Sequence, residues 1–179
     1  MAPSQGELPP ELTEGGLTVN IRKTTMQDLP DVCRIYERAR DFMRKSGNPD
    51  QWKEEFPTPE IVARDIEADS SYLCISDDKI AAVFYFNVED EPSYLKIGGQ
   101  WLNDDPYGVV HRIASSRVIK GAGEFCINWC LDRCHNLRID THRDNLPMRY
   151  MLDKLGFVHC GRIWLENGDE RMAFQKVSK

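Results

Sequence analysis

Long apolar runs are missing from this sequence, because no stretch approaches the roughly 18 residues that a membrane-spanning helix needs. The first residues, Met1 to Glu7, contain neither a basic segment nor an apolar one. We therefore expect no secretory signal. These two absences argue against a membrane partner and lead us to expect a cytoplasmic protein.

The sequence also lacks an excess of positive charge. Lys and Arg number 23 against 29 Asp and Glu, which leaves a formal net charge of −6. Proteins that bind nucleic acid without sequence preference neutralise its phosphates with Lys and Arg, so we expect no nucleic-acid partner. A mild negative field suits a cationic amine as substrate, although solubility alone also accounts for such a charge.

Closely spaced cysteine pairs are absent as well. The six cysteines include Cys126, Cys130 and Cys134, which lie four residues apart and so share one face of a helix. Zinc sites usually combine tighter pairs with histidines, and disulfides are rare in cytosolic proteins. We interpret the three thiols as small packing residues and expect no metal site.

Hydrophobic periodicity predicts one domain at 17–179, preceded by a flexible leader at 1–16 that is rich in Pro, Gly, Glu and Ser. The pattern predicts strands at 17–22, 71–76, 79–88, 109–115, 137–141, 157–165 and 171–177, and helices at 29–45, 58–68, 121–134 and 147–155. Residues 89–108 form a long connection with several aromatic residues, a feature that is often functional in a compact domain. The order of elements indicates a mixed α/β fold with a partly parallel sheet.

A glycine-rich turn, Lys120-Gly121-Ala122-Gly123, stands between a predicted strand and a predicted helix. Glycines let the backbone approach an anion, and the helix N-terminus adds its dipole, so this arrangement favours phosphate binding. The turn lacks the third glycine of a dinucleotide fingerprint and the Lys-Ser/Thr ending of a Walker loop. Taken alone, such a turn is more often structural than ligand-binding.

Neighbouring segments place this turn in a wider pattern. The strand His111-Arg-Ile-Ala-Ser115 precedes the loop Val118-Ile119-Lys120-Gly121-Ala122-Gly123, Asn145 follows the next strand, and Lys154-Leu-Gly-Phe157 ends the last helix. In these elements the chain resembles the GNAT superfamily of acetyltransferases, from about Val19 to Val177. The segments 48–52, 106–108, 111–114 and 138–142 resemble a smaller set of uncharacterised bacterial members.

The resemblance implies a GNAT-like fold, with a twisted mixed sheet of about seven strands and about four helices. It implies a coenzyme A site in a gap between the strands at 109–115 and 137–141. Pantetheine is expected along the backbone of Ile113, Ala114 and Ser115, the pyrophosphate on the N–H groups of Val118–Gly123, and Asn145 beside the pantetheine arm or the far end of the cofactor. The implied activity is direct transfer of an acetyl group from acetyl-CoA to a primary amine.

Two positions depart from the family pattern. The Gln or Arg that usually opens the phosphate loop is replaced by Val118, next to Arg117. The tyrosine that usually protonates the leaving thiolate is replaced by Leu152, and Tyr150, about 200° round the helix, faces elsewhere. Phosphate contacts through the backbone survive these changes, whereas the usual general acid is absent or replaced.

Histidines are the best candidates for the base that removes the proton of the acceptor ammonium. His111 and His142 each belong to one of the two separating strands, and Asp140 is placed to orient a histidine or to bind the amine. A structural role fits each histidine, taken singly, slightly better than a catalytic one. We predict that at least one of them acts in the site.

Trp52, Trp101 and Tyr107 are predicted to line the acceptor pocket, because aromatic rings give shape and attract cations. Core packing is the competing role for each of them. The acceptor, a small-molecule or peptide amine, is not specified by the sequence, and a homodimer is one oligomeric state that it leaves open. Two other interpretations stand beside the enzyme: a GNAT-like module that binds acetyl-CoA without turnover, suggested by Leu152, and a structural domain whose glycines only make a turn.

Overall fold

The computed structural model describes residues 12–14 and 17–179. The leader expected at 1–16 therefore lies mostly outside the described residues. Its described part, Leu12–Glu14, is a short strand, β1, which pairs antiparallel with β2 at Leu17–Lys23.

The elements predicted by periodicity are confirmed, with ends that agree within one residue. After β2 they are α1 (Leu29–Lys45), α2 (Pro59–Glu67), β3 (Ser71–Ser76), β4 (Lys79–Val88), β6 (Gly108–Ser115), α3 (Ala122–Cys134), β7 (Asn136–Thr141), α4 (Leu146–Lys154), β8 (Val158–Trp164) and β9 (Glu170–Val177). The additional elements are short: β1, β5 (Gly98–Gly99), and the 3-10 turns η1 (Met26–Asp28) and η2 (Pro92–Tyr94). Segments of two or three residues carry no hydrophobic period, so the sequence pattern could not reveal them.

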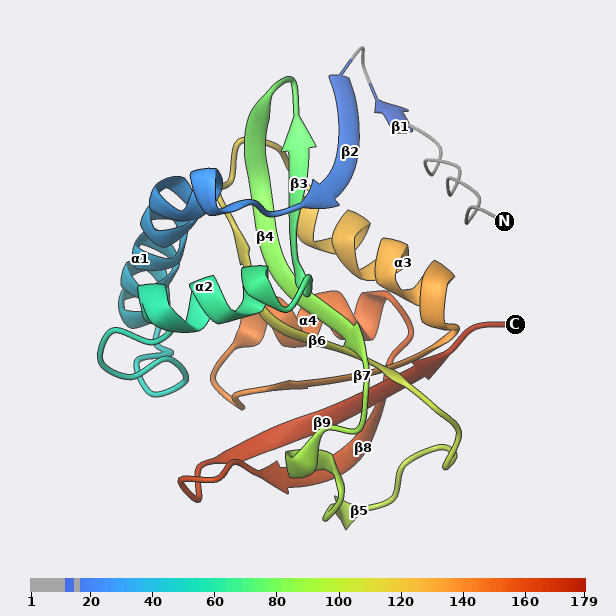
Figure 1. Ribbon diagram of the computed structural model, residues 1–179. Coiled ribbons are helices and arrows are strands. Elements are labelled where there is room, and N and C mark those ends of the chain that lie inside the picture. The colour runs from blue at the N-terminus through green and yellow to red at the C-terminus, as the bar shows by residue number, and fades with distance from the viewer. Residues whose placement is uncertain (1–11, 15–16) are drawn as a thin grey trace.

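A single nine-stranded sheet, in the order β1-β2-β3-β4-β6-β7-β9-β8-β5, forms the centre of the protein. Neighbouring strands are antiparallel except β6 and β7, which are parallel. Strands β2 to β4 run along the upper half of the molecule and β7 to β9 cross its lower half, with β6 between them (Figure 1). This is the mixed α/β architecture predicted from the sequence.

Helices cover both faces of the sheet, because successive side chains of a strand point to opposite faces. Leu73 and Val83 pack with α1 and α2, whereas Cys74 and Phe84, their neighbours in sequence, pack with α3 and α4. All four side chains are fully buried. The sheet thus separates two hydrophobic cores, and the molecule has three layers (Figure 1).

The helices are short and each buries one face. The longest, α1, has 17 residues and buries Val32, Ile35 and Tyr36. In the part of the chain that the structure describes, no helix is long and apolar enough to cross a membrane. On α3, Cys126 and Cys130 are fully buried in the core and Cys134 is half-buried.

The long connection between β4 and β6 is held by aromatic packing. Tyr94 and Tyr107 are buried in it, and Trp101 packs against Tyr94 with ring centroids 5.2 Å apart. The guanidinium of Arg138, on β7, lies 4.3 Å from the Trp101 ring centroid and 3.9 Å from that of Tyr107. Its Nη2 also donates to the Asn103 carbonyl at 2.8 Å. The connection is thereby anchored to β7.

Candidate active site

Strands β6 and β7 separate soon after they meet. Their parallel pairing is limited to Gly108 with Leu137 and Val109 with Arg138. Beyond these pairs β6 continues beside β4, and β7 continues beside β9. A gap therefore opens between the later residues of β6 and β7, where the family resemblance implied it.

A bulge in β6 bends the strand at this gap. His111 lies opposite Tyr85 and Ala114 lies opposite Val83. His111 and Ala114 are three positions apart on β6, whereas their partners Tyr85 and Val83 are two positions apart on β4. The extra residue on β6 defines a bulge, which increases the local twist. Arg112, within the bulge, has a φ of +50°, a left-handed conformation that is uncommon for a residue other than glycine.

Helices α1 and α2 hold the bulge in place. The Tyr36 hydroxyl, from α1, donates to the Arg112 carbonyl at 2.7 Å. The Arg112 guanidinium donates to the two carboxylate oxygens of Asp65, from α2, at 2.9 and 2.8 Å. Burial raises the pKa of Asp65, although the neighbouring Arg112 opposes this shift. The ion pair ties the start of the gap to the helical layer.

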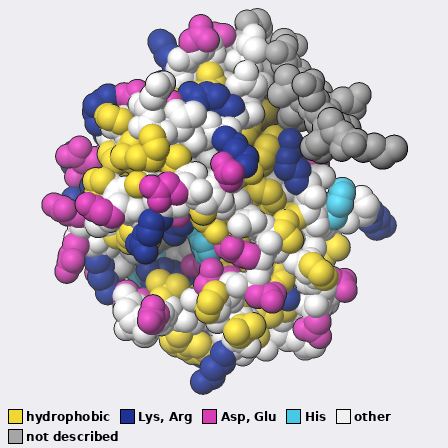
Figure 2. Space-filling view, in the orientation of Figure 1, with side chains coloured by type: hydrophobic (Ala, Val, Ile, Leu, Met, Phe, Trp, Pro, Cys, Tyr) yellow, Lys and Arg dark blue, Asp and Glu magenta, His cyan; other side chains and the backbone are white. Residues whose placement is uncertain are grey.

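A cavity of about 700 Å³ lies at the gap, a volume typical of sites for small molecules. Its walls include His111 and Ile113 from β6, Asp140 from β7, Asn145 at the start of α4, and Trp52 from the connector after α1. In Figure 2 a histidine lies in a hollow near the middle of the face shown, with acidic and basic side chains around it. The cavity therefore combines aromatic walls with several charged groups.

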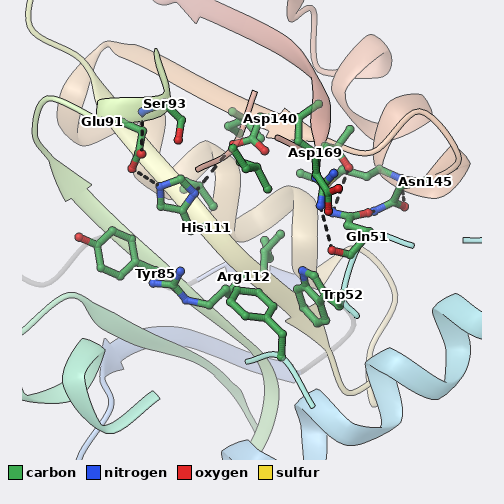
Figure 3. Close-up of a pocket in the computed structure, with 18 of the residues that line it drawn as sticks. Gln51, Trp52, Tyr85, Glu91, Ser93, His111, Arg112, Asp140, Asn145 and Asp169 are labelled. Carbon is green, nitrogen blue, oxygen red and sulfur yellow. Dashed lines mark hydrogen bonds and ion pairs between the residues drawn. The ribbon is translucent and has the colours of Figure 1, made fainter. Parts of the chain in front are cut away.

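His111 lies between two carboxylates in this cavity (Figure 3). Its Nε2 is 2.9 Å from Glu91 Oε2, and its Nδ1 is 4.0 Å from Asp140 Oδ1. The hydrogen bond with His111 lowers the pKa of Glu91, so Glu91 is ionised and can only accept. In the neutral imidazole Nε2 consequently carries the proton, and Nδ1 keeps a free lone pair on the side of Asp140.

Each of the two carboxylates is fixed by another donor. The backbone N–H of Ser93 donates to Glu91 Oε1 at 3.2 Å, and the buried Tyr94 hydroxyl donates to Asp140 Oδ1 at 2.7 Å. Burial, followed by the charge of Asp140, raises the pKa of Tyr94 well above its usual value. The residues on both sides of His111 thus have defined orientations.

The lining of the cavity also includes the carboxylate of Glu89. The Tyr85 hydroxyl donates to Glu89 Oε1 at 2.6 Å, and the Asn87 amide donates to Glu89 Oε2 at 3.3 Å. Burial and then Glu89 raise the pKa of Tyr85 to about 12. The Tyr85 ring packs against His111 with ring centroids 5.6 Å apart. Tyr85 therefore connects the surroundings of His111 to Glu89.

The glycine turn lies outside the cavity lining but is suited to an anion. None of the backbone N–H groups from Val118 to Gly123 donates a hydrogen bond to another described residue. Gly121 has a φ of +83°, and a Cβ there would meet nothing within 4 Å. Lys120 is exposed beside it. A row of unpaired N–H groups at the start of α3 is the arrangement that binds phosphates.

The cofactor residues expected on β6 and α4 have distinct positions. Ile113 faces the cavity, Ala114 is buried toward α1 and α2, and the Ser115 hydroxyl accepts from the Arg117 N–H at 3.0 Å. Asn145 caps α4 by accepting from the Met148 N–H at 3.3 Å. Its side-chain amide donates to Gln51 Oε1 at 2.8 Å, so it lines the cavity in a fixed orientation.

His142 is the predicted catalytic residue that the structure separates from the others. It lines an adjoining hollow of about 240 Å³, and its Nδ1 accepts from the Asp144 N–H at 3.1 Å. Burial, followed by the positive charge of Arg171, lowers the pKa of His142. The two hollows share Lys53, Asp169 and Arg171 as lining residues, but only His111 faces the larger one.

Of the three aromatic residues expected in the acceptor pocket, only Trp52 lines the cavity. It is buried and packs edge-on against Tyr36 at 5.7 Å between ring centroids. Trp101 and Tyr107 instead enclose the Arg138 guanidinium. Periodicity and residue type could not distinguish these two environments, because an aromatic ring suits both.

The position at which the family usually has its acid tyrosine is a packing position in this chain. Leu152 is fully buried in the core beneath α4, whereas Tyr150 is 70% exposed. Neither residue lines the cavity. The expectation that Tyr150 faces away from the site agrees with its position.

Several cavity residues were not recognised in the sequence: Gln51, Asp65, Tyr85, Glu89, Glu91 and Arg171. Glu89 and Glu91 lie at the start of the long connection whose length and aromatic residues are often a sign of function, so a sequence signal for them exists. Asp65 and Arg171 sit within ordinary helix and strand patterns. Only the tertiary structure brings them to the gap.

No family model matches this chain, and no curated protein sequence matches it. A solved structure of a GNAT-family acetyltransferase from Streptococcus agalactiae is similar, with a TM-score of 0.82 and 29% identity over 90% of this chain and 96% of that one. A putative acetyltransferase from Staphylococcus aureus has a TM-score of 0.67 and 24% identity over 89% and 99% of the two chains. The ribosomal-protein-S18-alanine N-acetyltransferase from Escherichia coli has a TM-score of 0.59 and 15% identity over 90% and 95%.

The similarity to the streptococcal protein extends over almost the full length of both chains. The gap between β6 and β7 is the feature that the sequence resemblance implied, whereas the bulge in β6 was not expected from the sequence. The chain therefore has the fold of the GNAT superfamily of acetyltransferases and is similar in sequence to one of its members.

Proposed function

We propose that this protein transfers the acetyl group of acetyl-CoA directly to a primary amine of a small molecule or peptide. The observation that carries the proposal is the position of His111, between Glu91 and Asp140, in a cavity at the gap between β6 and β7. The net charge of −6 supports a cationic acceptor over a nucleic acid.

The residues around the gap fit coenzyme A. The free N–H groups of the turn at 118–123 would hold the pyrophosphate, and the open space at Gly121 leaves room for it. Ile113 and Ser115, on the part of β6 that β7 does not pair, would hold the pantetheine arm, with Asn145 on the opposite side. When bound, acetyl-CoA supplies the activated acetyl group as a thioester.

His111 is the proposed general base. An amine reacts only after it loses its ammonium proton, and Nδ1 of His111 has the free lone pair that accepts it. Asp140 lies on the same side and would attract the ammonium before that transfer. Glu91 acts through His111 as a positioning residue, because its hydrogen bond selects the tautomer with the proton on Nε2. His142, in the adjoining hollow, is the second candidate base.

The alternative is a module that binds acetyl-CoA without turnover. The specific observation in its favour is Leu152, which is fully buried and offers no proton where the family usually has a tyrosine. The two functions differ in whether thiol is released when amine is added.

A thiol-release assay with a panel of primary amines, after calorimetric confirmation of acetyl-CoA binding, tests the proposal. We expect amine-dependent thiol release, and a loss of about 100-fold or more in kcat/KM for His111→Ala. Binding of acetyl-CoA with no thiol release for any amine would support the non-catalytic module. Full activity in both His111→Ala and His142→Ala would show that neither histidine is the base.

A further inference from the structure

The carboxylates of the large cavity divide into two groups by their partners. Asp65 forms a bidentate ion pair with Arg112, and Asp169 accepts from Lys53 Nζ at 3.0 and 3.1 Å. Glu89, Glu91 and Asp140 have no Lys or Arg within ion-pair distance among the described residues. Their hydrogen-bond partners are instead neutral groups and one histidine.

These three carboxylates are only partly accessible to water. The exposed fractions of the Glu91 and Asp140 side chains are 19% and 12%, and Glu89 is half-buried. Removing a carboxylate from water is costly unless a cation accompanies it. Tyr85 stays protonated at neutral pH, because its pKa is raised to about 12, so the hydroxyl that donates to Glu89 is an uncharged donor.

The cavity as a whole is acidic. Its walls carry six carboxylates (Glu54, Asp65, Glu89, Glu91, Asp140 and Asp169) against three cationic side chains (Lys53, Arg112 and Arg171). Lys53 and Arg112 are already paired with Asp169 and Asp65, and no Lys or Arg of the described residues lies within ion-pair distance of Glu89. One acceptor ammonium beside Asp140 and His111 would leave the charge at Glu89 uncompensated.

We propose that the acceptor of this enzyme is a diamine or polyamine, and that Glu89 binds its second ammonium group. The inference rests on the proposed function for the position of the reactive amine, near His111 and Asp140, and on the cavity itself for the binding space. The Tyr85 ring lies between the two positions: it packs on His111 at 5.6 Å between centroids, and its hydroxyl contacts Glu89 at 2.6 Å. An alkyl chain that links the two ammonium groups would run beside this ring, which also contacts the Arg112 guanidinium at 4.9 Å from the ring centroid.

The competing acceptor is an amine that carries a carboxylate. Arg171 lines the same cavity, is 5% exposed, and donates to the carbonyls of Glu170 and Gln51 rather than to a carboxylate. A carboxylate-bearing amine would use Arg171 in place of Glu89. Three ligands with the same chain length separate these acceptors: putrescine has two amines, butylamine has one, and γ-aminobutyrate has one amine and one carboxylate.

The test measures the binding of each ligand to the full chain by calorimetry in the presence of saturating coenzyme A, and separately measures acetylation of each ligand. Glu89→Gln removes the proposed charge while keeping two hydrogen-bonding atoms in place. Asp90→Asn is the matched control, because it removes the same charge from the next residue, which is exposed and does not line the cavity.

We expect putrescine to bind about tenfold more tightly than butylamine, because one partly buried ion pair contributes on this order. In Glu89→Gln this ratio should fall to near one, and in Asp90→Asn it should stay at the wild-type value. Equal binding of putrescine and butylamine by the wild type, or tighter binding of γ-aminobutyrate, would overturn the inference. A ratio of putrescine affinity to butylamine affinity in Glu89→Gln that equals the wild-type ratio would also overturn the inference.

The two readouts distinguish failure of the inference from failure of the proposed function. Selective binding of putrescine without acetylation of any ligand would leave the second-ammonium site standing and contradict the acetyltransferase. Acetylation of butylamine and putrescine with equal kcat/KM, together with equal binding, would leave the acetyltransferase standing and contradict the site.

Discussion

Nε2 of His111 lies 2.9 Å from Oε2 of Glu91, in a contact that joins the bulged strand β6 to the connection after β4. The two residues are 20 positions apart in the sequence, so the contact depends on the folding of the whole connection. Because the pair fixes which nitrogen of His111 is free, it would set the direction of amine deprotonation in the proposed reaction.

Replacing Glu91 by Gln removes the charge that orients His111 while keeping a side chain of the same size. We expect kcat to fall by about 10- to 100-fold, as is typical when an orienting partner is lost. The Kd for acetyl-CoA, measured by calorimetry, should change little, because the glycine turn and the free edge of β6 are untouched. Asp90→Asn is the control, and an equal loss of kcat in both variants would contradict the positioning role of Glu91.

The glycine turn gives a second prediction. Gly121 and Gly168 have φ values of +83° and +86°, and a Cβ at either would meet nothing within 4 Å. Substitution by Ala should therefore lower the free energy of unfolding by about 1 kcal/mol in both variants, because both force a side chain into the left-handed region. Only Gly121→Ala should weaken acetyl-CoA binding, by about tenfold. Comparable Kd values in the two variants would show that the turn does not bind the cofactor.

The sequence predicted regular elements better than contacts between them. Long periodic segments such as α1 and β4 carry enough side chains to reveal which face is buried. The bulge at Arg112 left no such signal, because its left-handed φ occurs in a residue that rarely adopts it. His111 and Asp140 were named from their strands, but their partner Glu91 comes from an irregular connection. The ion pair between Asp65 and Arg112 spans 47 positions and was equally invisible.

Leu152, which stands where the family usually has its acid tyrosine, is expected to contribute to stability. Leu152 is fully buried in the core, and we expect Leu152→Ala to reduce the free energy of unfolding by about 2–5 kcal/mol, measured by urea denaturation. Tyr150→Ala, on the same helix, should change it by about 0.5 kcal/mol or less, because that side chain is 70% exposed. A small effect of Leu152→Ala would mean that this position is not a packing site.

His142 provides a prediction for pH. Its pKa in the folded protein is lowered from 6.5, first by burial and then by Arg171. As the pH falls below 6.5, the unfolded chain therefore binds a proton before the folded chain does, and the free energy of unfolding decreases. His142→Gln should remove the decrease in the free energy of unfolding that occurs between pH 6.5 and the lower pKa of folded His142. His159→Gln, at an exposed position, serves as the control. An unchanged slope in His142→Gln would contradict the shift.

We propose direct acetyl transfer at the cavity that contains His111. Its most direct test is a single-turnover reaction with acetyl-CoA and an amine acceptor, in which mass spectrometry follows both the amine and the intact protein. We expect the acetyl mass to appear on the amine, the protein never to be acetylated, and His111→Ala to slow the transfer by about 100-fold or more. An acetylated protein that forms before the product, or bound acetyl-CoA that is never consumed, would contradict it.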